Sequence, residues 1–316
     1  MPTREAFART SQSPTGGRSV ARTRSSGVER GAQLLKRSRP RFWLYLAGPV
    51  LVGLAYGAST LGDLVSPVAL VLFAYFLVPA NVYLYGVNDV FDAPADEENP
   101  KKGSAAGDGG LLGGDAPEVR WTGDRLELGV VLACGLAGLA LLAVVPLTAA
   151  VWVVGFLVLG AAYSAPPARL KTRPPLDSVS NGLYVLPGAA AYVALAGTQP
   201  PLLAVLGAWL WTMAMHTFSA VPDIEPDRRA GLETTATVLG HRGALAYCGG
   251  CWLLAAGLFG VLDPRAGLLL LVYPALVVAV AVSEVSVDRA YWWYPAVNTV
   301  VGAILTMGGL WRVVYG

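Results

Sequence analysis

Charged residues are scarce in this chain. Asp, Glu, Lys and Arg make up 14% of its 316 residues, whereas apolar residues make up 54%. An ordinary globular domain is about one quarter charged. The mean hydropathy of +0.53 points the same way. The composition therefore excludes an ordinary water-soluble domain and places the chain among integral membrane proteins.

Histidine and cysteine are rare as well, with two and three copies. Neither joins the acidic clusters described below at a ligand spacing, which disfavours a zinc site. Cys134, Cys248 and Cys251 all lie in apolar stretches. The last two have the spacing of a redox or metal motif, but a second pair of ligands is missing. We therefore interpret all three as buried, unreactive thiols.

The N-terminal 40 residues lack an apolar run. No apolar segment precedes Phe42, which argues against a signal peptide. Residues 1–41 contain ten Lys and Arg against Glu5 and Glu29, a net charge of +8, so the remaining 275 residues bring the total to +2 by summing to −6. The cations are scattered without aromatic neighbours or periodicity, so nucleic-acid binding is not expected. We predict a disordered basic cytoplasmic tail over residues 1–40, and its attraction to anionic membrane lipid stays open.

Long apolar segments fill the rest of the chain. Each is long enough to cross a hydrocarbon core about 30 Å thick. The alternating pattern of barrel strands is absent, so helices are expected. Residues 41–316 are therefore predicted to form one all-α integral membrane domain with nine transmembrane helices. The predicted helices cover residues 41–59, 66–88, 126–146, 148–165, 178–197, 201–221, 243–262, 266–283 and 291–314.

The positions of the cations predict the orientation. With the N-terminus in the cytoplasm, only Arg265 and Arg312 fall on the outer side, in agreement with the positive-inside rule. The chain is then a multi-pass protein of the cell membrane with a cytoplasmic N-terminus and an external C-terminus. The long polar loops after the second and sixth helices are cytoplasmic, so the chemistry is expected on that side. The Gly-rich insertion Lys101–Asp115 is interpreted equally well as a linker and as a lid.

A first acidic motif stands at the end of the second predicted helix. Asn88, Asp89, Asp92 and Asp96 follow one another there. Asn88 and Asp92 are four residues apart, so they share a helix face, which Asp96 would continue. Pro94 is expected to end or bend the helix nearby.

A second acidic motif follows the sixth predicted helix, where Asp223 and Asp227 are again four residues apart. Pro222 suits the first turn of a short helix, and Pro226 argues that this helix is irregular. Any single Asp at a membrane boundary is most simply a solvated loop residue. Two such clusters on the same membrane face instead indicate an oxygen-rich site for a hard divalent cation, Mg²⁺, which leaves positions for phosphate oxygens.

Basic residues near the two motifs are candidates for binding the remaining charge of a diphosphate. Cationic cytoplasmic loops are also the topological default, so each cation has this simpler explanation. The candidates are Lys101, Lys102, Arg169, Lys171, Arg228 and Arg229.

The pairing of N-D-x-x-D-x-x-x-D with a later D-x-x-x-D-x-x-x-G resembles the UbiA superfamily of intramembrane prenyltransferases, over nearly the whole chain from Arg41 to Tyr315. Asn81 and the segment Tyr163–Lys171 resemble further family elements. The resemblance implies a helix bundle whose central apolar cavity opens to cytoplasmic Asp-rich loops. It also implies catalysis by Asp89, Asp92, Asp223 and Asp227, Mg²⁺ ligation by Asn88, Asp89, Asp92, Asp96, Asp223 and Asp227, and diphosphate contacts from Lys101 or Lys102, Arg169 and Lys171.

Three stretches, residues 79–89, 173–184 and 215–224, are most similar to the lycopene elongases of C50 carotenoid biosynthesis. That likeness implies transfer of a dimethylallyl group from its diphosphate to lycopene, in some members with addition of water. A quinone precursor, a porphyrin or a prenylated glycerol phosphate is the alternative acceptor. A transporter is disfavoured because the acidic clusters lie at helix ends and no inverted repeat is evident.

Polar residues within the apolar helices are acceptor-side candidates, able to position water or to take a proton. They are Asn81, Asp177, Asn181 and His216. Asp177 is equally well explained as the N-cap of the fifth predicted helix, and His216 as a hydrogen-bonded packing residue. The aromatic run Tyr291–Tyr294 is interpreted as an interfacial anchor, because belts of Trp and Tyr mark the headgroup level.

Overall fold

The structure is a computed structural model that describes residues 38–96, 125–283 and 286–316. The side chains of residues 93–96 and of Asp288 are not included in that description. The predictions for the tail before Ser38, for Lys101 and Lys102, for the Gly-rich insertion and for the Asp96 side chain therefore lie outside the described residues.

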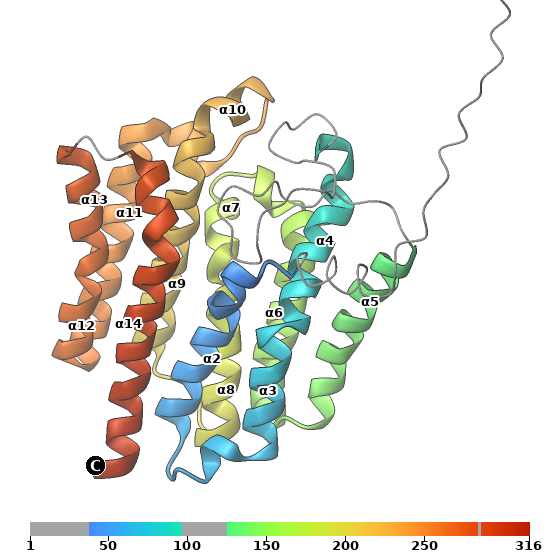
Figure 1. Cartoon of the computed structure of the whole chain (residues 1–316), viewed down its shortest axis with the longest axis vertical. Coiled ribbons are helices and arrows are strands. Elements are labelled where there is room, and N and C mark those ends of the chain that lie inside the picture. Colours follow the sequence, from blue (N-terminus) through green and yellow to red (C-terminus); the bar gives the residue numbers. More distant parts are fainter. Residues whose placement is uncertain (1–37, 97–124, 284–285) are drawn as a thin grey trace, which may run out of the picture.

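Every secondary-structure element in the described ranges is a helix, and the helices form one bundle (Figure 1). The α-helices are α2 (Trp43–Gly57), α3 (Pro67–Leu77), α4 (Pro79–Asp96), α5 (Arg125–Ala140), α6 (Leu147–Ser164), α7 (Leu176–Val179), α8 (Leu186–Ala196), α9 (Leu202–Ala220), α10 (Ile224–Arg229), α11 (Thr235–Leu262), α12 (Pro264–Leu270), α13 (Val272–Val282) and α14 (Val287–Tyr315). Short 3-10 helices join or extend them: η1 (Pro40–Phe42), η2 (Asp63–Val65), η3 (Leu141–Ala143), η4 (Leu170–Thr172), η5 (Ser180–Tyr184) and η6 (Val221–Asp223).

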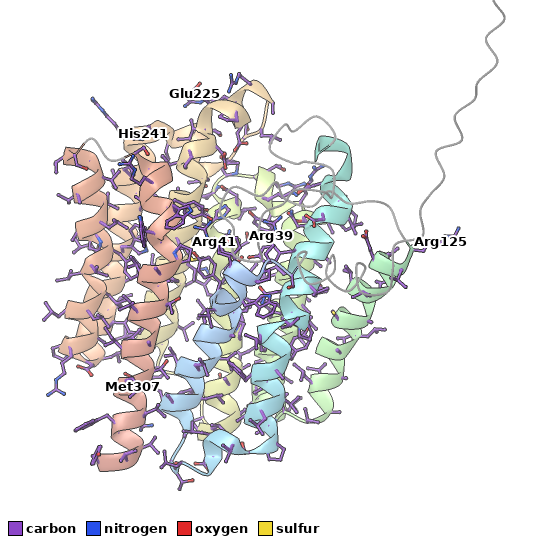
Figure 2. The ribbon with its side chains drawn as sticks, in the orientation of Figure 1. Arg39, Arg41, Arg125, Glu225, His241 and Met307 are labelled. Carbon is purple, nitrogen blue, oxygen red and sulfur yellow. The ribbon has the colours of Figure 1, made fainter. Side chains whose placement is uncertain are left out.

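Eight helical segments in the described ranges are long and apolar enough to cross a membrane. The all-helical membrane fold is thus confirmed. The remaining predicted segment, residues 41–59, contains the 15-residue helix α2. At 1.5 Å per residue α2 is only about 23 Å long, so the count of nine crossings stays a prediction. The bundle carries exposed apolar side chains such as Val261 and Leu268. Met307 is another, on the outer side of α14 (Figure 2). Such side chains suit contact with lipid.

The second predicted span is broken between α3 and α4. Val78 leaves the helical conformation, with φ −125° and ψ −59°, and Pro79 has no backbone N–H to continue the ladder. The side-chain nitrogen of Asn81 donates to the carbonyl oxygens of Phe76 (3.2 Å) and Leu77 (3.0 Å). Asn81 therefore satisfies carbonyl groups at the break, which would otherwise be costly inside a membrane.

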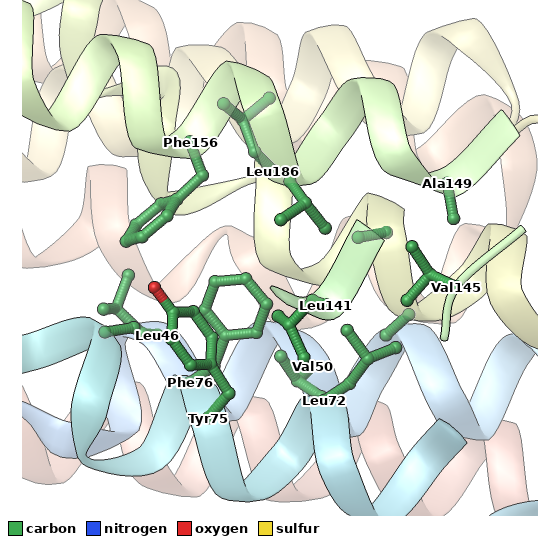
Figure 3. Close-up of a cluster of buried hydrophobic side chains, with 14 of the residues drawn as sticks. Leu46, Val50, Leu72, Tyr75, Phe76, Leu141, Val145, Ala149, Phe156 and Leu186 are labelled. Atoms are coloured by element: carbon green, nitrogen blue, oxygen red, sulfur yellow. The ribbon is translucent and has the colours of Figure 1, made fainter. Parts of the chain in front are cut away.

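Two groups of buried apolar side chains hold the described part of the bundle together. One joins α2, α3, α4, α6 and α8 around Phe76 and Phe156, whose rings meet edge to face (Figure 3). The other joins α9 to α11, α12, α13 and α14 around Trp252, Tyr273 and Tyr294. A space between the two groups is bordered by α2, α4, α6, η5, α9 and α14.

The two acidic motifs lie at the same end of the bundle. Figure 1 shows the C-terminal end of α4, the helix α7 and the helix α10 at one end, and the C-terminus of the chain at the opposite end. This arrangement agrees with the predicted clustering of the motifs on one side. The assignment of that side to the cytoplasm stays a prediction.

Candidate active site

A cavity of about 280 Å³ lies between the two halves of the bundle, close to the first acidic motif. Its walls are mostly aromatic and apolar, with a few polar groups. The residues that line it are Arg39, Phe42, Tyr45, Leu84, Tyr85, Asn88, Tyr163, Asn181, Leu183, Tyr184, Met215, His216, Ser219 and Tyr291.

Asn88 and Asp92 meet the same cation. The Lys171 ammonium, on η4, donates to Asn88 Oδ1 at 3.2 Å and contacts Asp92 Oδ1. Ser164 also donates to Asn88 Oδ1, at 2.9 Å, and the Arg169 guanidinium lies 3.7 Å from Asp92 Oδ1. The predicted shared helix face of Asn88 and Asp92 is therefore realised. Arg169 and Lys171 are brought to this motif, as their predicted role requires.

Asp89 faces a different cation, Arg39, which lies in the segment predicted as a basic tail. The carboxylate is buried, and its Oδ1 atom lies 3.6 Å from the guanidinium of Arg39. That guanidinium also lies over the ring of Tyr85, 4.6 Å from its centroid. Arg39 lines the cavity and stands just before η1 (Figure 2). Its position between Ser38 and Pro40, directly before the first helix, was the available signal that it differs from the rest of the basic segment.

The second motif forms the turn from η6 into α10. Asp223 ends η6, and Asp227 is the fourth residue of α10; both are half-buried. Pro226 is the third residue of α10, where a missing N–H leaves no helical bond unmade, so the proline is compatible with the short helix. Arg228 pairs with Glu225 at 3.2 Å and donates to the Thr237 carbonyl oxygen at 2.7 Å. The structure thus gives Arg228 partners on α10 and in the first turn of α11.

The side-chain oxygens of the first acidic motif can be judged as metal ligands from the cation that they contact. In the described ranges, no three His, Cys, Asp or Glu side chains form a group that could bind a metal by themselves. Asn88 and Asp92 nevertheless direct one oxygen each at a single cationic nitrogen. An all-oxygen set that converges on one cation fits Mg²⁺, which commonly takes one or two carboxylates and completes its shell with water and phosphate oxygens. The first motif therefore fits the ion, and the ligand role of each residue stays a prediction.

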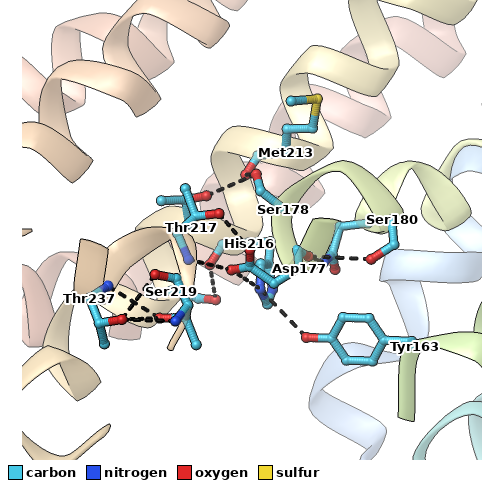
Figure 4. A network of polar contacts seen from close by, with 12 residues as sticks. Tyr163, Asp177, Ser178, Ser180, Met213, His216, Thr217, Ser219 and Thr237 are labelled. Atoms are coloured by element: carbon cyan, nitrogen blue, oxygen red, sulfur yellow. Dashed lines mark hydrogen bonds and ion pairs between the residues drawn. The ribbon is translucent and has the colours of Figure 1, made fainter. Parts of the chain in front are cut away.

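Asp177 belongs to a separate polar network on α7, α9 and α11 (Figure 4). Its side chain is 1% exposed, and it accepts hydrogen bonds from the Thr235 backbone N–H (2.8 Å) and the Thr235 hydroxyl (2.5 Å). Pro175, not Asp177, is the N-cap of α7. Asp177 therefore caps the first residue of another helix, α11, because the fold brings that helix end beside α7.

His216 and Asn181 reach the cavity wall, and Asn81 does not. His216 Nε2 lies 3.5 Å from the Tyr163 hydroxyl and 4.0 Å from Asp177 Oδ2. Asn181 donates to the backbone oxygen of Asp177 at 2.6 Å. Asn81 lies at the break between α3 and α4 and is absent from the lining. The structure thus brings three of the four acceptor-side candidates together: Asp177, Asn181 and His216.

The aromatic run Tyr291–Tyr294 corrects one expectation. Tyr291 lines the cavity and Tyr294 is fully buried, whereas Trp292 and Trp293 are exposed. Residues three apart share a helix face and residues one apart do not, so the run splits into an inward pair and an outward pair. Only Trp292 and Trp293 are placed to serve as interfacial anchors.

Comparison with known proteins shows the family to which the chain belongs. The sequence model of the "UbiA prenyltransferase family" matches residues 124–311. The "Lycopene elongase/hydratase" of Haloferax volcanii is 59% identical over 88% of this chain and 89% of its own length. The protein of the same name from Halobacterium salinarum is 58% identical over 88% of this chain and 97% of its own length.

Among solved structures, a UbiA homolog from Archaeoglobus fulgidus bound to DMAPP and Mg²⁺ superposes with a TM-score of 0.68 at 20% identity. The match covers 90% of this chain and 100% of that one. At this identity the likeness concerns the fold alone. Together with the family match and the close relatives, it confirms the predicted class of protein, and the chain belongs to the UbiA prenyltransferase family of membrane-embedded prenyltransferases.

Proposed function

We propose that this prenyltransferase transfers a dimethylallyl group from its diphosphate to one end of lycopene and adds water at the neighbouring carbon, in C50 carotenoid biosynthesis. The names of the two haloarchaeal relatives support this choice of acceptor. The observation that carries the proposal is the position of Asn88. Asn88 lines the aromatic cavity and also binds the Lys171 cation beside Asp92. A diphosphate held at that cation therefore presents its prenyl carbon to the cavity.

On the donor side, we propose that Asn88, Asp89, Asp92, Asp96, Asp223 and Asp227 hold Mg²⁺, with Asp89, Asp92, Asp223 and Asp227 essential for catalysis. The metal supplies charge neutralisation of the leaving diphosphate when it is bound. Arg169 and Lys171, already at the first motif, bind diphosphate oxygens directly. Lys101 or Lys102 and Arg228 complete the set of cations that we propose to bind the diphosphate. As the C–O bond breaks, its electron pair stays on the diphosphate and these cations stabilise that charge.

On the acceptor side, the cavity walls protect the allylic cation. Tyr45, Tyr85, Tyr163, Tyr184 and Tyr291 surround the space, and the faces of aromatic rings attract a cation while keeping bulk water away. At about 280 Å³, the cavity lies at the lower limit of ordinary ligand sites, about 300–1,000 Å³. It accommodates a C5 group and the end of an acceptor. The rest of a C40 polyene extends into the apolar surroundings.

The test is an incubation of the purified chain with Mg²⁺, dimethylallyl diphosphate and lycopene, analysed by mass. The expected product is longer by one or two C5 units, with the mass of added water. A parallel incubation offers homogentisate as a quinone precursor. Prenylation of that acceptor without any longer carotenoid would reject the lycopene assignment in favour of the alternative acceptor class.

The same assay tests the metal-binding motif. Asp92→Asn should lower turnover by at least about 100-fold, because it removes a charged ligand that acts on the departing diphosphate. Asp63→Asn is the matched control, since Asp63 lies in the loop between α2 and α3 at the opposite end of the bundle. Hydrogen bonds from the backbone of Thr60 and Ser59 lower the pKa of Asp63, so the control also removes an ionised carboxylate. Normal turnover in Asp92→Asn would reject the metal role.

A further inference from the structure

A histidine on the cavity wall, His216, is paired with the buried carboxylate of Asp177. His216 is on α9, and its side chain is 20% exposed within the cavity lining. The acidic motifs and their cations serve the diphosphate, so none of them is free to take a proton from the acceptor side. His216 is the imidazole that the cavity offers, since the other histidine of the chain, His241, lies on the surface at the start of α11 (Figure 2).

The partner of His216 is held in one position. Asp177 receives the backbone N–H and the hydroxyl of Thr235 on opposite oxygens. These bonds offset the cost of burying a carboxylate. Oδ2, which accepts the Thr235 N–H, is also the oxygen 4.0 Å from His216 Nε2. A proton gained by His216 would thus create an imidazolium directly beside a fixed negative charge.

A second polar group of the cavity lies near the same nitrogen. The Tyr163 hydroxyl lies 3.5 Å from His216 Nε2, with the two rings edge to face at 6.0 Å. Asn181 lines the cavity beside them, whereas Ser219 donates its hydroxyl to the His216 carbonyl oxygen at 2.7 Å. The Tyr163 phenol is a hydrogen-bond donor and acceptor that can orient a water molecule at Nε2. The remaining lining residues are apolar or aromatic except for Arg39 and Asn88, which belong to the first acidic motif and its cations.

We propose that His216 is the catalytic base of the water-addition step and that Asp177 positions and charge-stabilises it; this inference rests on the proposed function. The terminal double bond of the acceptor attacks the dimethylallyl carbon, which forms the new C–C bond and leaves a tertiary cation on the neighbouring acceptor carbon. The oxygen of a water molecule forms a bond to that cation. Its surplus proton passes to His216 Nε2 and then to solvent. The products are a tertiary alcohol and diphosphate.

The alternatives within the cavity are weaker bases for this step. Asp177 is 1% exposed and is not part of the cavity lining, so it acts through His216. Asp92 contacts Lys171 and Arg169 on the diphosphate side. The Tyr163 phenol is protonated at neutral pH and serves as a hydrogen-bonding group.

The experiment measures the ratio of hydrated to unsaturated C5-extended product. In His216→Asn the tertiary cation should lose a proton instead of gaining water, and the hydrated share should fall about 100-fold, within the usual range for loss of a general base. Asp177→Asn should lower that share about tenfold while C5 transfer continues. Added imidazole should restore the hydrated product in His216→Ala, an effect that a structural role would not give. His241→Asn is the matched control and should behave as wild type.

The possible outcomes distinguish the proposed base role of His216 from the proposed function itself. An unchanged ratio in both His216→Asn and His216→Ala rejects the base, as does a wild-type chain that yields only unsaturated C5-extended product. If His216→Asn fails to fold, the test uses His216→Ala with added imidazole. If imidazole does not restore the hydrated product while C5 transfer continues, the proposal that His216 is the base is rejected. A wild-type chain that makes no C5-extended carotenoid at all rejects the proposed function itself.

Discussion

Lys171, on η4, contacts the carboxylate of Asp92, on α4, across 79 positions of the chain. The same ammonium reaches Asn88 Oδ1, and Arg169 stands 3.7 Å from Asp92. The guanidinium of Arg39 likewise lies 3.6 Å from Asp89 Oδ1. The chain's own cations therefore lie beside the carboxylates of Asp89 and Asp92.

Removal of divalent metal should stop turnover without loosening the fold. The carboxylates of Asp89 and Asp92 keep cationic neighbours when metal is absent, so neither of these two charges is left unpaired. After treatment with EDTA we expect no product, full recovery on adding Mg²⁺, and an unfolding midpoint lowered by less than about 2–4 °C, which corresponds to about 1 kcal/mol. A much larger fall in the midpoint would contradict this account.

Lys171→Gln should weaken donor binding. The substitution removes one charge-assisted contact, worth about 1.5–3 kcal/mol, so KM for dimethylallyl diphosphate should rise about 10- to 100-fold. Steady-state kinetics at saturating Mg²⁺ measures it. Arg173→Gln, in the same loop, is the control because Arg173 donates to the Pro167 carbonyl oxygen and is exposed. Equal KM in the two variants would remove Lys171 from the donor site.

The sequence predicted the arrangement of Asn88 and Asp92 better than the surroundings of the acceptor-side candidates. The spacing of Asn88 and Asp92 fixes a common helix face whatever the surroundings, and both reach one cation. The partnership of Asp177 with Thr235 depends on two helices meeting, 58 positions apart, and no local pattern encodes it. Arg39 was assigned to the tail because charge composition cannot separate the last cation of a basic segment from the first residue of a cavity wall.

The prediction of helix boundaries was wrong where a proline interrupts the backbone hydrogen bonds of a helix. The prediction of a continuous helix over residues 66–88 did not anticipate the break at Val78, although Pro79 is visible in the sequence. The predicted helix over residues 266–283 likewise divides into α12 and α13, with Leu271 between them and Pro274 in the first turn of α13. A hydropathy pattern reports the apolar length of such a segment and is blind to a missing N–H.

Arg39→Gln should increase the affinity for Mg²⁺. The guanidinium neutralises the buried Asp89 in the absence of metal, so a metal ion that binds Asp89 must displace it. Calorimetric titration with Mg²⁺ should show tighter binding by about threefold or more, given about 1 kcal/mol for a partly exposed pair. Arg41→Gln is the control, because Arg41 donates to the Trp292 carbonyl oxygen instead. Weaker Mg²⁺ binding in Arg39→Gln would show that Arg39 assists the metal.

Gly53→Ala should destabilise the bundle by about 1–3 kcal/mol, the usual cost of overpacking. Helices α2 and α8 cross closely at this point, and a methyl group at Gly53 would lie 2.1 Å from the carbonyl oxygen of Gly188. A backbone atom cannot move aside as a flexible side chain does, so the two helices must separate, and small residues at such crossings are what let membrane helices approach. Gly48→Ala is the control on the same helix, since a methyl group there meets no atom within 4 Å. Thermal unfolding in detergent compares the two, and equal midpoints would mean that α2 and α8 are not packed as closely as the structure places them.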